Sequence, residues 1–313
     1  MPIETYHTLI SRNKRNTWLL IVVFAMVFVG LGVLIGNVWG GGNAEFSILT
    51  AASAGLIAFL LTLASYYGGS SVLLGISHAR EISKSDDPQL FNVVEEICLA
   101  GGLPVPKIYV IEDSAMNAFA TGRDPKHASV AITSGLRGRL NREELEGVIA
   151  HELSHVRHYD ILFATLIAVM VGVLVMLCDI FLRSMWWGGG RRRQSSDRQS
   201  EGGGGLQVIL LILALVLAIL APILAKIIQM AISRQREFLA DAGSVELTRN
   251  PTGLAHALAK LGGDEEVLEA ANRATAPLYI VHPIRKFEER ASSIFDTHPP
   301  LNERINRLMS LTQ

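Results

Sequence analysis

Residues 151–155 read His-Glu-Leu-Ser-His and place two metal-binding side chains four positions apart. In an α-helix, positions four apart lie on one face, so His151 and His155 can direct imidazole nitrogens at a single ion. Glu152, next to the first histidine, can reach a water molecule on that ion and act as a general base. The pattern therefore predicts a zinc-dependent hydrolase, with a metal-free histidine pair on an exposed helix as the simpler alternative.

A catalytic zinc site needs a third protein ligand and leaves a fourth position for water. The segment SRQREFLADAGSVE supplies Glu237 and Asp241, four positions apart on a predicted helix. We predict Glu237 as the third ligand of one Zn²⁺ per chain, with Glu246 as the fallback. Asp241 is expected to accept the N–H of a coordinating histidine, which we predict to be His151, and so to hold its tautomer. A charged, solvated helix face is the competing interpretation.

The composition places these residues in a membrane protein. Half of the residues are apolar and the mean hydropathy is +0.33, which is unusual for a soluble chain of this length. The net charge of −1 and the lack of a basic face with interleaved aromatic residues argue against nucleic acid as a partner, and no nucleotide-binding motif is present. The two cysteines, Cys98 and Cys178, are too few for a disulfide framework.

Four apolar segments are long enough to cross a bilayer as helices, which takes about 20 residues. They are Thr17–Val38, Phe46–Tyr67, Ile161–Leu182 and Leu206–Ile228. As core helices of a soluble protein they would leave too little polar surface to cover them. We therefore predict two transmembrane hairpins, the first of them a retained anchor rather than a cleaved signal.

Basic residues orient the first hairpin. Arg12, Lys14 and Arg15 precede it, Arg80 and Lys84 follow it, and its short connection carries no lysine or arginine. The positive-inside tendency then places the amino terminus and the region that follows the hairpin in the cytoplasm.

The second hairpin conflicts with that tendency. Its Gly/Arg-rich loop, residues 183–205, carries five arginines yet would lie on the far side of the membrane. Either the tendency is overridden, or the hairpin enters the membrane without crossing it. We favour a spanning hairpin, because Leu206–Ala225 contains one strongly polar residue, Gln207.

Local signals predict the elements around the motif. Asn141 and Glu144 form a capping box at the start of the HELSH helix. Helical periodicity indicates further helices over residues 88–100, 233–248 and 251–263. Alternating β-branched stretches at 107–112 and 127–136 predict a strand pair beside the HELSH helix, separated by the turn-rich stretch DSAMNAFATGRDPK. The edge of these strands can accept an extended peptide.

The hairpin explains how distant ligands meet. The histidine pair ends six residues before one apolar run and Glu237 follows the other by nine, so a hairpin returns both to the same membrane face. A continued helix would hold the ion roughly 10 Å from the lipid boundary.

Together these features resemble the M48 family of membrane metallopeptidases. The resemblance rests on two amino-terminal membrane helices, the hydrophobic hairpin, and the motifs NAFATG, HELSH, EFLAD and THPPLNER. It implies a mainly α-helical, gluzincin-like zinc peptidase with a small β-sheet, which faces the cytoplasm and cleaves misfolded or damaged membrane proteins under stress. The family's ligands fall on His151, His155 and Glu237, and its catalytic glutamate falls on Glu152.

Two further positions follow from the resemblance. Asn117 of NAFATG and His298 of THPPLNER match positions that line the substrate cleft in this family, where an amide or imidazole donor can stabilise an oxyanion. The alternatives are a turn asparagine and a histidine at the start of a helix. The remaining histidines are not predicted as ligands: His7, His78, His127, His158, His256 and His282.

These observations predict an inner-membrane, multi-pass zinc endopeptidase that acts on membrane-protein or unfolded polypeptide substrates. We divide the chain into a transmembrane hairpin (1–70), a cytoplasmic part with the HELSH helix (71–160), a second hairpin (161–230) and a cytoplasmic part with the third ligand (231–313). A prenyl-protein processing peptidase of the same family is the alternative, although that branch uses more membrane spans. A non-enzymatic membrane scaffold would have no reason to place Glu152 between the histidines.

Overall fold

The computed structural model describes residues 6–170, 172, 234–264, 266, 268, 278–280 and 299–312. The chain divides into two compact units. One comprises Met1–Thr17, Ser65–Val169 and Gln229–Gln313, and the other comprises Trp18–Ala64 and Met170–Ile228. The sheet and the predicted metal ligands belong to the first unit.

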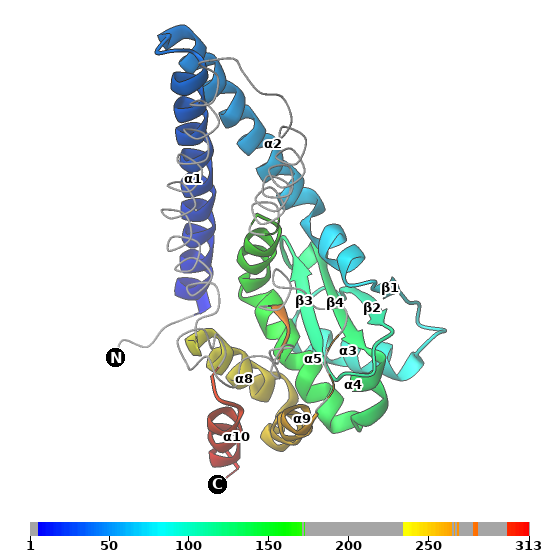
Figure 1. Ribbon diagram of the computed structural model, residues 1–313. Helices are drawn as coiled ribbons and strands as arrows, with labels where there is room; N and C mark the ends of the chain where they lie inside the picture. Colours follow the sequence, from blue (N-terminus) through cyan, green and yellow to red (C-terminus); the bar gives the residue numbers. More distant parts are fainter. Residues whose placement is uncertain are drawn as a thin grey trace, which may run out of the picture. The chain divides into compact units, whose positions relative to one another are not determined.

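Two helices in the described part of the chain are long and apolar enough to cross a membrane, judged by length and composition. They are α1 (Tyr6–Trp39) and α2 (Ala44–Ile76), and they form an antiparallel hairpin (Figure 1). Both helices extend beyond the apolar runs that predicted them. Gly41 and Gly42 both have positive φ angles in the connecting turn, a conformation that glycine adopts without strain.

The second predicted hairpin is described only at its start. The chain is helical over Asp160–Met170, which agrees with the beginning of the third apolar run. The rest of that run, the loop 183–205 and the fourth run, Leu206–Ile228, lie outside the described residues.

Within the described residues, a four-stranded sheet lies beside the HELSH helix, with the strand order β1-β2-β4-β3. The pairs β1–β2 and β3–β4 are antiparallel and the central pair β2–β4 is parallel. The strands are β1 (Arg80–Glu81), β2 (Lys107–Ile111), β3 (Ala118–Gly122) and β4 (Ala128–Thr133).

The predicted strand pair corresponds to β2 and β4, which do pair, but the assignment of the segment between them to turns was wrong. Residues 118–122 form β3, and every residue of that strand is buried. Both faces of the sheet are covered, so β3 lacks the polar-apolar alternation of a half-exposed strand. The end of the second predicted strand was also wrong, because Ser134–Arg139 forms the short helix α4.

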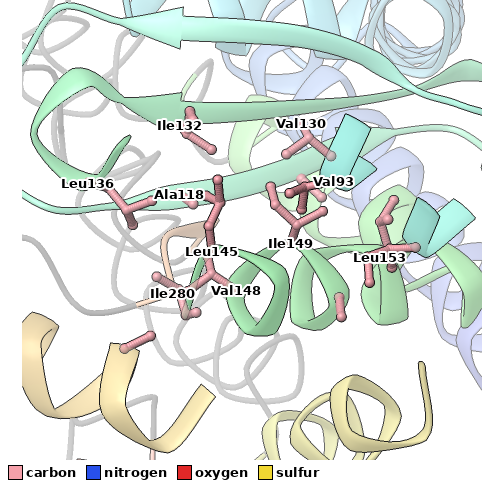
Figure 2. Close-up of a cluster of buried hydrophobic side chains, with 14 of the residues drawn as sticks. Val93, Ala118, Val130, Ile132, Leu136, Leu145, Val148, Ile149, Leu153 and Ile280 are labelled. Carbon is pink, nitrogen blue, oxygen red and sulfur yellow. The ribbon is translucent and has the colours of Figure 1, made fainter. Parts of the chain in front are cut away.

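The main core lies between the sheet and the HELSH helix, α5 (Arg142–Arg157). Figure 2 shows Val130 and Ile132 of β4 facing Leu145 and Ile149 of α5. These four side chains are fully buried, and each contributes about 1.5–3 kcal/mol relative to exposure. This packing anchors the helix that carries the histidine pair.

A smaller apolar cluster covers the opposite face of the sheet. There Phe119 and Ala131, whose sequence neighbours face α5, pack with Tyr279 and with Leu74 of α2. The rings of Phe119 and Tyr279 meet edge to face, with centroids 5.1 Å apart. Side chains of β3 and β4 therefore alternate between two buried faces.

The other predicted helices are confirmed. They are α3 (Pro88–Gly101), α8 (Arg234–Thr248) and α9 (Pro251–Gly263). The α5 capping box is also present: Glu144 N–H donates to Asn141 Oδ1 at 2.9 Å and Asn141 N–H donates to the Glu144 carboxylate at 2.9 Å. Helix α10 (Leu301–Ser310) was not predicted, although it follows the prolines of THPPLNER.

Candidate metal centre

Helix α8 packs against α5, and this brings the third predicted ligand to the histidines. A Cβ atom on Gly243 of α8 would lie 2.4 Å from Ser154 Oγ and 3.0 Å from Ser154 Cβ of α5, so a larger residue here would force Ser154 or the helices to shift. One residue later, Ser244 Oγ donates to the carbonyl of Gly147 in α5 at 2.8 Å. The register of the two helices is thereby set, and Glu237 faces the HELSH motif.

His151, His155 and Glu237 each offer one ligand atom within 4.8 Å of the others. The two Nε2 atoms are 3.3 Å apart, and each lies 3.7 Å from an oxygen of Glu237. Ligands about 2.0–2.1 Å from a tetrahedral zinc ion are separated by roughly 3.4 Å. The arrangement that we predicted from spacing is therefore of the right size for one such ion.

His151 is oriented by the predicted carboxylate. Its Nδ1 lies 3.0 Å from Asp241 Oδ1, and both side chains are almost fully buried. An Nδ1–H donated to Asp241 leaves the lone pair of Nε2 directed at the ion site. The contact that we expected for Asp241 is thus present.

Arg304 of α10 completes this side of the site, and we did not predict it. Its guanidinium donates to both oxygens of Asp241, at 2.6 and 2.9 Å, and lies 3.3 Å from Glu237 Oε2. The side chain is 0% exposed. A buried arginine here balances two buried carboxylates, and its bidentate contact holds Asp241 against His151.

His155 has a carboxylate partner that we also did not predict. Its Nδ1 lies 3.2 Å from Asp160 Oδ2, so the same logic of donation at Nδ1 directs Nε2 toward the ion site. Asp160 follows α5 within the stretch HELSHVRHYD. A carboxylate five residues after the second histidine was the available signal.

The two histidines differ in their proton affinity. Burial lowers the pKa of His151 below its ordinary value, against the opposing effect of Asp241. Burial also acts to lower the pKa of His155, but the hydrogen bond to Asp160 and the charge of Glu237 outweigh it and raise that pKa to about 9. A cation at this site must therefore compete with a proton on His155.

Glu152 lies beside the ligands and is 2% exposed. Burial and the charge of Glu237 raise its pKa to about 7, against the lowering effects of His155, Arg304 and a hydrogen bond from the Ala120 backbone N–H. A carboxyl group with a pKa near the working pH can both accept and return a proton. Strand β3, which provides Ala120, thus contributes to the site directly.

Asn117 precedes β3 and is buried. Its Oδ1 accepts the N–H of Ala118 at 3.1 Å, and its backbone N–H donates to Thr133 Oγ1 at 3.0 Å. These contacts tie it to the sheet, and its role as an oxyanion donor stays a prediction. His298 lies outside the described residues.

Glu246, the fallback ligand, is placed away from the centre. Its carboxylate pairs with Arg157 at 3.1 Å and is 40% exposed. The prediction of Glu246 as an alternative ligand was wrong, because this residue follows Glu237 by nine positions, or two and a half turns, and so lies on another side of α8.

The donor set suits zinc. Two imidazole nitrogens and one carboxylate are the protein ligands of many catalytic zinc sites, whereas calcium and magnesium prefer oxygen ligands alone. Acceptors for both Nδ1–H groups are in place, as such sites require. Of the other histidines whose side chains the structure describes, His78 and His256 are exposed, His127 pairs with Asp124, and His158 is the residue that follows the last turn of α5.

The sequence matches known proteins along its whole length. A model described as Peptidase family M48 matches residues 84–312. A Protease HtpX homolog of Streptococcus thermophilus is 44% identical over 302 residues, which is 96% of this chain and 98% of the relative. One from Dictyoglomus thermophilum is 44% identical over 97% of this chain and 94% of its own. One from Thermoanaerobacter pseudethanolicus is 43% identical over all of both chains.

One solved structure is also similar, the crystal structure of S. mikatae Ste24p. The match has a TM-score of 0.42 at 18% identity, and it covers 87% of this chain and 66% of that one.

Proposed function

We propose that this chain, which belongs to peptidase family M48, is a membrane-bound zinc endopeptidase. Its proposed substrates are misfolded or damaged membrane proteins. The family resemblance drawn from the motifs is confirmed, and it extends to the Protease HtpX homologs. The zinc ion, the endopeptidase activity and the quality-control substrates are our proposals.

One observation supports this function above the others. Three ligand atoms with the spacing of a tetrahedral zinc site converge beside a buried glutamate whose pKa is raised to about 7. A membrane scaffold or a transporter could bind a cation at such a site but would not need a proton acceptor beside it. Metal ligands next to a proton acceptor are the groups that a metal-assisted hydrolase requires.

The residues have distinct tasks in peptide hydrolysis. His151, His155 and Glu237 would hold the zinc ion, which supplies a Lewis acid for the scissile carbonyl and an acidified water. Glu152 accepts a proton from the water molecule while the water oxygen bonds to the scissile carbonyl carbon. It then returns the proton to the amide nitrogen as the carbon–nitrogen bond breaks. The products are one carboxylate and one amine.

Asn117 and His298 are proposed to donate hydrogen bonds to the oxyanion. For Asn117 this would require the amide N–H₂, since its Oδ1 accepts from Ala118. An Asn117→Ala variant that binds zinc normally and loses kcat with little change in KM would support this role, whereas an unchanged kcat would remove it.

The remaining proposals concern placement. We propose a gluzincin-like peptidase unit on the cytoplasmic face of the inner membrane, with both hairpins in the bilayer and the chain divided at residues 70, 160 and 230. The apolar lengths of α1 and α2 and the basic residues Arg12, Lys14 and Arg15 in the first turns of α1 support this orientation.

Exchange of Glu152 tests the mechanism. Glu152→Gln keeps the shape of the side chain but cannot accept a proton, so cleavage of casein by the purified full chain should fall by about 10²–10⁴-fold. Zinc content should stay unchanged. Glu143→Gln, an exposed position at the start of the same helix, is the matched control and should cleave normally. Undiminished cleavage by Glu152→Gln would refute the mechanism.

A further inference from the structure

The turn after α5 is contacted by the first turns of the amino-terminal helix. Asn13 of α1 donates from Nδ2 to the carbonyl of His158 at 2.9 Å and to Asp160 Oδ1 at 2.5 Å. Beside it, the ammonium of Lys14 lies 4.7 Å from the ring centroid of Tyr159. Three consecutive residues of the turn are therefore held by two consecutive residues of α1, all within the same compact unit.

The turn itself has a demanding conformation. Tyr159 has a φ of +62°, a left-handed conformation that costs a residue with a Cβ atom roughly 1 kcal/mol or more. This conformation ends α5 and starts the next helix at Asp160. It turns the chain so that the Asp160 carboxylate points back toward His155 in the last turn of α5. The contacts from α1 offset the cost of the conformation.

Asn13 has the donor that this position requires. Two acceptors, a carbonyl and a carboxylate, share its amide N–H₂ group, and Asn13 is 3% exposed. An aspartate in its place would present a second carboxylate to Asp160 at a buried position, where two like charges repel each other strongly. Arg236 is a charged neighbour of Asp160, with its Nε 3.8 Å from Oδ1.

The two oxygens of Asp160 have separate partners. Oδ1 accepts from Asn13, and Oδ2 lies against Nδ1 of His155 at 3.2 Å. Asn13 therefore sets the rotation of the carboxylate that sets the tautomer and ring orientation of His155. Asn13, Asp160 and His155 thus form a continuous series of contacts from α1 to the metal centre.

We propose that Asn13 and Asp160 are positioning residues of the metal centre, so that the start of the amino-terminal helix α1 is part of the peptidase and not only its anchor. The proposal rests on the proposed function, because it assigns His155 as a zinc ligand. It predicts that a change in α1, far from the HELSH motif in sequence, weakens zinc binding.

The test compares two identical exchanges in α1. Asn13→Asp should weaken zinc affinity of the purified full chain by about 10–100-fold, the usual effect of losing an outer partner of a metal ligand. Asn16→Asp, one turn along the helix at a half-buried position, carries the same charge change and should bind zinc as the wild type does. Affinity is measured by competition with a chelator of known zinc affinity, and thermal unfolding is recorded for each variant.

A double variant separates positioning from general destabilisation. In Asn13→Asp with Asp160→Asn, the amide at 160 can donate to the carboxylate at 13 while its Oδ1 still accepts from His155. Zinc affinity should recover by about tenfold or more relative to Asn13→Asp. If Asn13→Asp does not fold, Asn13→Ser and Asn16→Ser replace the first pair.

The measurements distinguish failure of the coupling between Asn13 and the metal centre from failure of the proposed function. Equal zinc affinity in the Asn13 and Asn16 variants, or losses at 13 and 160 that add without recovery, would overturn the coupling while leaving the peptidase intact. A wild-type chain that neither binds zinc nor cleaves casein in the same assays would instead overturn the proposed function.

Discussion

The two histidines of the HELSH motif lie one helical turn apart and aim at the same point, yet opposite ends of the chain support them. His151 is held by Asp241 and Arg304, from α8 and α10, and its side chain is 1% exposed. His155 is held by Asp160, from the turn after α5, which Asn13 of α1 holds in turn, and the His155 side chain is 17% exposed.

The two sides of the site differ in the charge of the supporting residues as well as in the part of the chain that supplies them. On the His151 side a buried arginine donates to both oxygens of Asp241, whereas on the His155 side the neutral amide of Asn13 donates to Asp160 and the nearest arginine nitrogen, Arg236 Nε, lies 3.8 Å away. A buried ion pair loses much when one partner is removed, since the other charge is left unpaired. The His151 side should therefore be the more sensitive half of the site, and the His155 side the more adjustable one.

Removal of Arg304 should have the largest effect on folding. Arg304→Ala leaves Asp241 and Glu237 buried without their cation, which should destabilise the fold by about 3–5 kcal/mol. The matched change on the other side, Asn13→Ala, removes a neutral partner and should cost about 1–3 kcal/mol. Chemical denaturation of both variants measures the difference, and equal losses would show that charge does not distinguish the two sides.

Exchange of the two orienting carboxylates should come next. Asp241→Asn and Asp160→Asn each weaken the donation from a histidine Nδ1–H, so each should reduce zinc affinity by about 10–100-fold. Asp241→Asn should be the more damaging, because it also takes a charge from beside Arg304. Chelator competition compares them, and a larger loss in Asp160→Asn would reverse our ranking of the two sides.

The pH dependence of zinc binding should belong to the His155 side. Because the pKa of His155 is raised to about 9, the ion must displace its proton at neutral pH. Affinity should then rise about tenfold per pH unit and level off above that pKa. The pKa of His151 is lowered, so it is already neutral over this range. Asp160→Asn should flatten the profile, and Asp241→Asn should leave its slope in place.

The smallest effect should come from a carboxylate on the same helix as Glu237 but outside the site. Glu246 forms a largely exposed pair with Arg157, and such pairs contribute about 0–1 kcal/mol. Glu246→Ala should therefore leave zinc content and casein cleavage unchanged. A loss of zinc from this variant would restore Glu246 as a ligand candidate.

The helices whose ends are specified by short-range signals could be predicted from the sequence. The capping box of Asn141 and Glu144 and the proline at the start of α9 act within a few residues, and both helices begin where predicted. The candidate ligand set could also be predicted, because the spacing within each helix indicates which side chains share a face. Strand β3 was missed because burial on both faces removes the alternation that marks a strand.

Most of the residues that orient the candidate ligands could not be predicted from the sequence. Arg304 meets Asp241 across 63 positions and Asn13 meets Asp160 across 147. No local pattern encodes such pairs. Asp160 is the exception, since it follows the HELSH helix directly. In THPPLNER the histidine drew the functional prediction, while the arginine of the same motif proved to contact the candidate site.

Metal content after removal of Glu237 tests the central claim most directly. Wild-type protein, Glu237→Ala and Glu246→Ala are dialysed against a weak chelator, and zinc per chain is measured. We expect one zinc ion in the wild type and in Glu246→Ala, and close to none in Glu237→Ala. Full retention of zinc by Glu237→Ala would contradict the account, because the two imidazoles would then bind the ion without the carboxylate that faces them.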